Sequence, residues 1–178
     1  MSDNNFQGYI KIRQLSNQRM YTLRASLNST KIKSVIKSVL GVSVPKIRTC
    51  SVYGRISLAW MAHDELLIMV NEPQSQVYND LQKNLVNHHA LLSDVSDARV
   101  AFELSGPAVC EVLAKLTPMD THSTKFKVGS FRRTRIAQVA GAVYRRDEQA
   151  IVLICFRSVE QYISSLLHAA AQQGSQVF

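Results

Sequence analysis

Residues 92–120, LSDVSDARVAFELSGPAVCEVLAKLTPMD, switch from strand-like to helix-like spacing of their apolar side chains. The first part alternates with the period of a half-buried strand, at Val100, Phe102 and Leu104. After Ser105-Gly106-Pro107 the spacing is that of an amphipathic helix, at Val109, Val112, Leu113 and Leu116. Pro118 disfavours helical geometry in the residue before it. The stretch therefore predicts a strand, a capped helix and a stop, which form a scaffold and not a catalytic constellation.

The same order of elements occurs earlier in the chain. A strand over 21–27 is followed by a cap at 28–30 and by a helix that ends at Gly41. A strand over 56–60 and the apolar strand 66–70 flank a turn at 63–64, and Pro73 and Ser75 open a second helix. The connector over 42–53 between the first helix and the next strand carries Pro45.

The second half repeats this plan with a longer connector, residues 117–134. A hairpin turn at 147–148, the apolar strand 150–156 and a helix with a capping box at Ser158 complete it. The chain therefore reads as β-α-β-β-α twice, an α+β fold of two ferredoxin-like halves with helices on one face of each antiparallel sheet. We expect an N-terminal arm over 1–19, halves over 20–91 and 92–173, and a tail over 174–178.

Composition limits the class of protein. A chain of 178 residues with 46% hydrophobic content can bury a core, and no apolar run reaches the roughly 18–20 residues that span a bilayer. The N-terminus lacks a secretory signal, and Cys50, Cys110 and Cys155 are odd in number and far apart. These features predict a cytoplasmic protein with reduced thiols and no membrane contact.

Motifs for catalysis, cofactors and metals are missing from the sequence. No Cys lies at ligand spacing from a His, and the Rossmann, P-loop and Gly-x-Ser-x-Gly patterns do not occur. The helical position of Cys110 favours a core thiol over a nucleophile. Asp94 and Asp120 are tested as acidic ligands, but their loop positions favour hydrogen bonds to backbone N–H groups. We therefore expect no catalytic, cofactor-binding or metal residue.

Several segments together resemble a known family. DVSDARVAFELSGPAVCEVLAKLTPMD is similar to a stretch of the aminomethyltransferase-like, folate-binding-domain superfamily, and YTLRASL, LAWMAHDELLIMV and VGSFRRTRIAQVAGAVYRRDEQAIVLICF extend the likeness over about residues 20–170. Within that superfamily the chain most resembles the gamma subunits of heterotetrameric sarcosine oxidases. The superfamily is built from two such halves, in agreement with the duplication.

The resemblance implies a non-catalytic assembly subunit of an oxidoreductase complex. Such a complex oxidises sarcosine to glycine and hydrogen peroxide, and tetrahydrofolate accepts the one-carbon unit as 5,10-methylenetetrahydrofolate. FAD, FMN, NAD, tetrahydrofolate and zinc belong by this analogy to the alpha, beta and delta subunits. A stand-alone folate-binding module and a basic RNA-binding module remain as alternatives.

The net charge of +8 calls for a partner or a solvated basic face. Ferredoxin-like RNA binders carry aromatic stacking pairs on their strands, and the apolar strand 150–156 has only Phe156. The polar face of the last helix is not basic, which disfavours a membrane surface. Other basic groups lie on the first helix and at the second hairpin turn, at Lys31, Lys33, Lys37, Arg145 and Arg146. An acidic protein partner therefore fits best, with no nucleic acid and no membrane.

The long connector is the predicted contact surface. Connectors longer than about 12–15 residues are usually functional or disordered. In this one the apolar residues Phe126, Val128 and Phe131 interleave with basic ones, which is typical of a protein interface. The predicted interface residues are Lys125, Lys127, Phe131, Arg132, Arg133 and Arg135.

Overall fold

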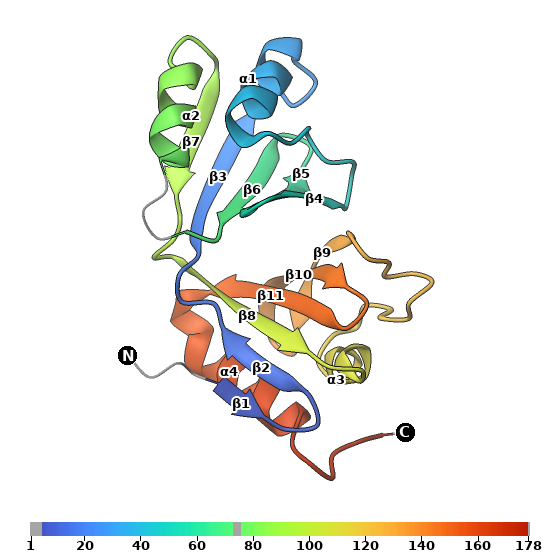
Figure 1. The fold of residues 1–178 in the computed structure, drawn as a ribbon. Helices are drawn as coiled ribbons and strands as arrows, with labels where there is room; N and C mark the ends of the chain where they lie inside the picture. The colour runs from blue at the N-terminus through green and yellow to red at the C-terminus, as the bar shows by residue number, and fades with distance from the viewer. Residues whose placement is uncertain (1–4, 73–75, 178) are drawn as a thin grey trace. The chain divides into compact units, whose positions relative to one another are not determined.

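A computed structural model describes residues 5–72 and 76–177. The chain divides into two compact units, unit 1 with Met1–Ser16 and Ala98–Phe178, and unit 2 with Asn17–Asp97. Each unit holds one antiparallel sheet and two α-helices (Figure 1). The predicted α+β class and the two halves are confirmed. The predicted helix start at Pro73 and Ser75, residues 1–4 of the arm and residue 178 of the tail lie outside the described residues.

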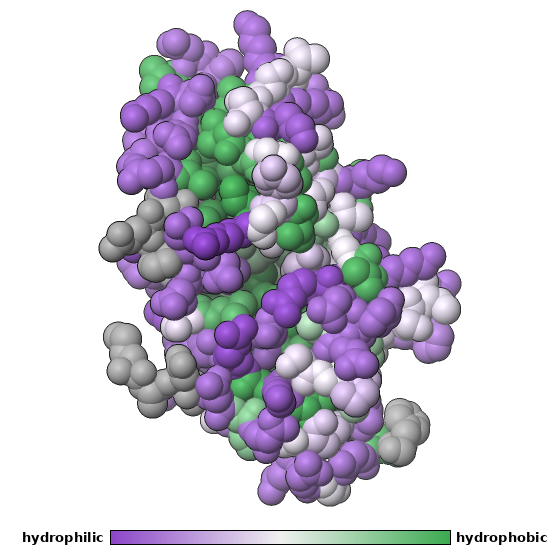
Figure 2. Space-filling model, in the orientation of Figure 1, coloured by the Kyte–Doolittle hydropathy of each residue, from purple (hydrophilic) through white to green (hydrophobic). Residues whose placement is uncertain are grey.

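Unit 2 is a five-stranded sheet with the strand order β4-β5-β6-β3-β7. Its elements are β3 (Arg19–Ala25), α1 (Thr30–Leu40), β4 (Cys50–Tyr53), β5 (Ile56–Ala62), β6 (Glu65–Val70), α2 (Val77–Leu85) and β7 (Ala90–Asp94). All six residues of β6 are buried, as its continuous apolar run predicts. In the space-filling view apolar side chains show among hydrophilic ones over α1 and α2 (Figure 2).

Helix α1 forms where its apolar stripe and Gly41 predict it, although no side chain caps its start at Ser29. Ile32, Ile36 and Leu40 are buried against the sheet, at the spacing of one helical face. Gly41 ends the helix with φ +69°, and its N–H donates to the carbonyl of Lys37. A left-handed residue at this position favours glycine, which has no Cβ to clash.

Unit 1 is a six-stranded sheet with the strand order β1-β2-β8-β11-β10-β9. Its elements are β1 (Asn5–Gln7), β2 (Lys11–Gln14), β8 (Arg99–Ser105), α3 (Val109–Ala114), β9 (Phe131–Ile136), β10 (Val139–Asp147), β11 (Ala150–Phe156), a 3₁₀ turn (Arg157–Val159) and α4 (Glu160–Ala170). Residues of β8 and β11 pack with α3 and α4 in one core that includes Phe102, Leu153, Leu113 and Ile163. The strand–turn–helix motif of residues 98–116 is therefore central to this unit.

Two of the predicted domain boundaries are wrong. The first strands are not a free arm, because β2 pairs with β8 and buries Ile12 to 1% exposure. Gly8 allows the chain to reach this position, since a Cβ there would collide with the carbonyl of Ala171. The halves meet after Asp97 and not after residue 91, because β7 pairs with β3 and completes the sheet of unit 2.

Three local predictions also differ from the structure. Both predicted connectors contain an edge strand, β4 in unit 2 and β9 in unit 1. No capping box forms at Ser158, because α4 begins after a 3₁₀ turn and has no side-chain cap. Leu113 is fully buried, as the apolar stripe that contains it predicts. The spacing in the last helix favours Leu166 as a core residue, but Leu166 is half-buried and its neighbour Leu167 occupies the core position.

Candidate functional site

Strand β9 carries most of the predicted interface residues and is the last strand of the unit 1 sheet. It pairs with β10 in antiparallel register, with Arg133 opposite Ala142 and Arg135 opposite Ala140. Because side chains alternate along a strand, these two arginines share one face of the sheet, and Arg132 points to the other face. Arg133 and Arg135 are exposed, and Lys125 and Lys127 are exposed in the loop before the strand.

The predicted apolar anchors of this surface are mostly core residues. Phe126 and Phe131 are each only 1% exposed. Phe126 belongs to the hydrophobic core of unit 1, and Phe131 lies opposite Tyr144 of β10, which is also buried. Phe131 is therefore wrong as an interface residue, and Val128, 46% exposed, is the apolar residue of this connector that remains at the surface.

Arg132 is less accessible than the prediction assumed. It is half-buried, and its Nη1 donates to its neighbour's carbonyl, that of Phe131, at 2.9 Å. Arg135 is exposed, and its Nη2 donates to Oε1 of Gln138 across the tight turn between β9 and β10 at 3.1 Å. The outward basic groups of the candidate surface, named the β9 edge from here on, are therefore Lys125, Lys127, Arg133 and Arg135.

The buried side chain of Arg145 supports the loop before β9. It is therefore not a surface charge at the tip of the second hairpin. It is 3% exposed, its Nη1 donates to the carbonyl of Phe126 at 2.6 Å, and its Nη2 pairs with Oε2 of Glu148 at 2.8 Å. Backbone hydrogen bonds from Gly129 to Arg145 and from Arg145 to Ser130 fasten the loop just before β9. In the sequence, the spacing Arg-x-x-Glu is a weak signal that Arg145 pairs with Glu148. No sequence pattern indicates that Arg145 also binds the carbonyl of Phe126.

A second charged group lies across the same sheet. Glu103 of β8 accepts a hydrogen bond from Nη2 of Arg13 at 3.1 Å and another from Nη1 of Arg146. The Glu103 side chain is 10% exposed, and the two arginine side chains are 56% and 44% exposed. Arg146 also pairs with Asp147, with 3.8 Å between Nε and Oδ2, so two carboxylates balance the two guanidinium groups here.

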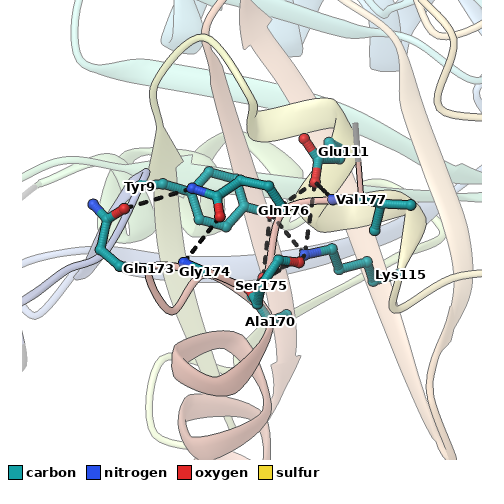
Figure 3. Close-up of polar contacts among 9 residues, drawn as sticks. All are labelled: Tyr9, Glu111, Lys115, Ala170, Gln173, Gly174, Ser175, Gln176 and Val177. Atoms are coloured by element: carbon teal, nitrogen blue, oxygen red, sulfur yellow. Dashed lines mark hydrogen bonds and ion pairs between the residues drawn. The ribbon is translucent and has the colours of Figure 1, made fainter.

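The densest polar cluster in unit 1, the Lys115 cluster, joins both ends of the described chain to α3 (Figure 3). Lys115 Nζ donates to Oη of Tyr9 at 2.8 Å, to the carbonyl of Ala170 at 3.0 Å and to the carbonyl of Ser175. Glu111 accepts from Tyr9 Oη at 3.2 Å and from the backbone N–H of Val177 at 2.8 Å.

The hydrogen bonds of this cluster fasten chain segments to one another. An ammonium group has three N–H donors, and three internal acceptors use all of them at Lys115. The pKa of Glu111 lies below its ordinary value, first because of the Val177 N–H and then because of Tyr9 and Lys115. The i,i+4 spacing of Glu111 and Lys115, opposite the apolar stripe of the helix, favours an exposed ion pair. Their side chains are instead only 16% and 19% exposed. Only the fold brings Tyr9 and residues 175–177 to them.

The cysteines and the loop aspartates lie in the following environments. Burial raises the pKa of the Cys155 thiol to about 11, which keeps it protonated, and Cys110 is half-buried in α3. Asp94 accepts from the N–H of Ser96 at 2.9 Å, and Asp120 accepts from the N–H of His122 at 2.9 Å, as their loop positions predicted. Within residues 5–72 and 76–177, no three His, Cys, Asp or Glu side chains gather as metal ligands. No helix in that part of the chain is long and apolar enough to cross a bilayer.

Comparison with solved structures places this fold beside two enzymes. The chain superposes on the heterotetrameric sarcosine oxidase from Corynebacterium sp. U-96, solved in complex with pyrrole 2-carboxylate, with a TM-score of 0.85 and 24% identity over 94% of this chain and 87% of that one. It also superposes on the glycine cleavage system aminomethyltransferase T from Bartonella henselae, with a TM-score of 0.68 and 13% identity over 90% of this chain and 46% of that one. At these identities the likeness shows a common fold.

Sequence comparison shows the family. The curated relatives include the sarcosine oxidase subunit gamma of Corynebacterium sp. (strain U-96), 28% identical over 144 residues, which are 79% of this chain and 69% of the relative. The subunit gamma of Corynebacterium sp. (strain P-1) is 28% identical over 153 residues, 84% of this chain and 74% of the relative. The model of the sarcosine oxidase, gamma subunit family matches residues 25–173. The resemblance found in the sequence is thereby confirmed, and the chain belongs to the sarcosine oxidase gamma subunit family.

Proposed function

We propose that this chain is a non-catalytic assembly subunit of a heteromeric sarcosine oxidase. The observation that carries the proposal is the family match over residues 25–173, which reaches across both units. The complex oxidises sarcosine to glycine and hydrogen peroxide, and tetrahydrofolate accepts the one-carbon unit. FAD, FMN, NAD, tetrahydrofolate and zinc are held by the alpha, beta and delta subunits, and this chain docks against the large ones.

The polar chemistry of the chain supports an assembly role. The Lys115 cluster and Arg145 use their charged groups on internal carbonyls and carboxylates, where they fix loops and chain segments. Such groups are engaged inside the chain, where they stabilise its shape. What the chain offers outward is charge, and the β9 edge offers it on the last strand of a sheet.

The β9 edge has the features of a contact surface for an acidic protein. A strand at the edge of a sheet presents unpaired backbone groups, and another chain can add to it. Guanidinium groups pair with carboxylates in a bidentate manner, so Arg133 and Arg135 suit an acidic partner strand or loop. Arg145 holds the preceding loop in place, which reduces the conformational entropy lost on binding.

Co-expression with the other oxidase subunits tests the proposal. The tagged wild-type chain should co-purify with them, and the double variant Arg133→Glu, Arg135→Glu should retain at least tenfold less while keeping its circular dichroism spectrum. The double variant Lys31→Glu, Lys83→Glu changes the net charge equally in unit 2 and serves as the control. A wild-type chain that captures no subunit contradicts the assembly role. Equal capture by both double variants and the wild type contradicts only the β9 edge.

The two alternative functions gain no supporting observation. The likeness to the aminomethyltransferase is one of fold, so it does not favour a folate site on this chain. An RNA-binding sheet would need several exposed aromatic residues on its strands. On β11, Phe156 is exposed at the strand end and the six residues before it are buried.

A further inference from the structure

A hollow of about 640 Å³ opens at the surface of unit 2 and has no part in the sites described above. Its walls come from four segments: the turn before α1, α1 itself, the loop after α1, and the end of β5 with His63 in the turn that follows. The apolar part is formed by Val44, Pro45 and Trp60, and Lys33 and Lys46 stand beside it. No carboxylate lines the hollow.

A strained turn holds an apolar side chain at this hollow. Ile47 lines it and is 69% exposed, although a large aliphatic side chain is usually buried. The next residue, Arg48, has φ +61°, a conformation that side chains other than glycine rarely adopt. Three hydrogen bonds fix the turn. The N–H and the Oγ1 of Thr49 both donate to the carbonyl of Lys46, at 3.1 and 2.8 Å. The N–H of Trp60 donates to the carbonyl of Thr49 at 3.0 Å. Strain that the surroundings maintain is typical of functional segments.

The two lysines at the hollow carry positive charge, and the nearest acidic residue in the sequence, Asp64, contacts His63 and Arg24 instead. No Asp or Glu occurs between Asp3 and Asp64 in the sequence, whereas lysines and arginines recur throughout that stretch. Elsewhere in unit 2, Arg24 pairs with Glu65 and Arg55 pairs with Glu72. Lys33 and Lys46 form no ion pair with any other residue that the structure describes. The two ammonium groups therefore remain available to carboxylates from outside the chain.

We propose that this hollow is a docking site for an acidic segment of a larger oxidase subunit. An apolar side chain of that segment enters beside Trp60 and contacts Ile47, and flanking carboxylates pair with Lys33 and Lys46. An apolar anchor within a charged rim is the usual composition of a protein interface. The inference rests on the proposed assembly function, and it places a second contact on unit 2, separate from the β9 edge on unit 1.

Two charge reversals with the same net change separate the hollow from the general charge of the chain. Lys33→Glu with Lys46→Glu alters the hollow. Lys31→Glu with Lys83→Glu alters two exposed lysines of the same unit that do not line it. Both should stay folded, because all four side chains are exposed. Ile47→Asp is a third variant, which removes the exposed apolar contact without a core substitution.

Each tagged variant is co-expressed with the other oxidase subunits, and the captured subunits are quantified per tagged chain. We expect at least tenfold less capture by the hollow pair and by Ile47→Asp, and wild-type capture by the control pair. Equal capture by all variants, or equal loss by both pairs, overturns the docking site. A wild-type chain that forms a dimer on its own, lost in Ile47→Asp, overturns it in favour of a second copy. If the wild-type chain captures nothing, the assembly function itself fails and the docking site falls with it.

Discussion

The two units use the same strand order but complete their sheets with strands from different places in the chain. In unit 2 the strand beside β3 is β7, which follows α2 directly. In unit 1 the equivalent strand beside β8 is β2, and the whole of unit 2 lies between β2 and β8 in the sequence. Both pairings are antiparallel. The β-α-β-β-α plan therefore leaves one edge of its first strand open, and a strand from either direction can fill it.

The helices that follow the first strands differ as well. Helix α1 has 11 residues and a left-handed glycine cap, whereas α3 has only 6 residues. Unit 1 makes up for the short helix with its long connector, which buries Phe126 in the core and is held by Arg145. One aromatic side chain of a mostly exposed loop thus adds to the core of unit 1, and Arg145 satisfies the backbone carbonyl of that same residue.

Core truncation should give the largest effects and should be equal in the two units. Leu113 of α3 and Leu81 of α2 are both fully buried. Leu113→Ala and Leu81→Ala should each lower the free energy of unfolding by about 2–5 kcal/mol, because each leaves a cavity. Urea denaturation followed by circular dichroism measures this loss. Leu166→Ala on α4 is the control and should cost less, since Leu166 is half-buried. A loss as large at Leu166 would mean that α4 presents another face to the core.

The next test compares the two strands that complete the sheets. Ile12 of β2 is 1% exposed, and Leu92 of β7 is half-buried at the corresponding sheet position. Ile12→Ala should cost about 2–4 kcal/mol of unfolding free energy, and Leu92→Ala about 1–2 kcal/mol. Hydrogen exchange of the backbone amides should show faster exchange in unit 1 for Ile12→Ala and in unit 2 for Leu92→Ala. A negligible effect at Ile12 would return residues 1–16 to the status of a free arm.

Mild acid should weaken unit 1 through one histidine, and this is the smallest expected effect. His168 of α4 stacks on Phe6 of β1 with ring centroids 4.4 Å apart, and burial lowers its pKa below 6.5. A base with a lowered pKa in the folded state takes up its proton more readily when unfolded. Its contribution to stability is therefore complete above pH 6.5 and is lost as the pH falls from 6.5 toward the folded-state pKa.

Urea midpoints between pH 7 and pH 5.5 measure this loss. His168→Gln should reduce the pH dependence of the unit 1 transition, and His63→Gln, at an exposed position of unit 2, should not change it. A second loss of stability comes from Glu111 at lower pH. Because its pKa is lowered in the folded state, its contribution to stability is present above pH 4.5 and is lost as the pH falls below that value. The same slope in His168→Gln and in the wild type would show that the Phe6 contact does not disfavour protonation.

The layers of the fold could be predicted from sequence because their signals are local. The alternation at Val100, Phe102 and Leu104 and the stripe that contains Leu113 mark a strand and a helix without any knowledge of the partner elements. The short edge strand β9 was missed because its four middle residues are three arginines and a threonine, which resemble a polar loop. The pairing of β9 depends on β10, and the sequence pattern of one strand does not show which other strand it pairs with.

The candidate site was harder to predict than the fold. The basic composition of the connector was visible, but the burial of Phe131 and Phe126 depends on which face of a sheet each one meets. The Lys115 cluster joins residues more than a hundred positions apart, so no motif could show it. The hollow beside Trp60 escaped detection for the same reason, because the walls come from four separate segments.

The discontinuity of unit 1 has a consequence for biosynthesis. Chains emerge from the ribosome at about 5–20 residues per second, so β2 waits on the order of ten seconds for β8 to follow it. During that time unit 2 has all of its own strands and can fold, while Ile10 and Ile12, both 1% exposed in the finished protein, have no sheet to join. We expect the nascent chain to pass through a stage in which one unit is complete and a short apolar segment ahead of it is open to chaperones or to wrong pairing. The order of synthesis thus leaves β2 without its partner strand until all the strands of unit 2 have been made.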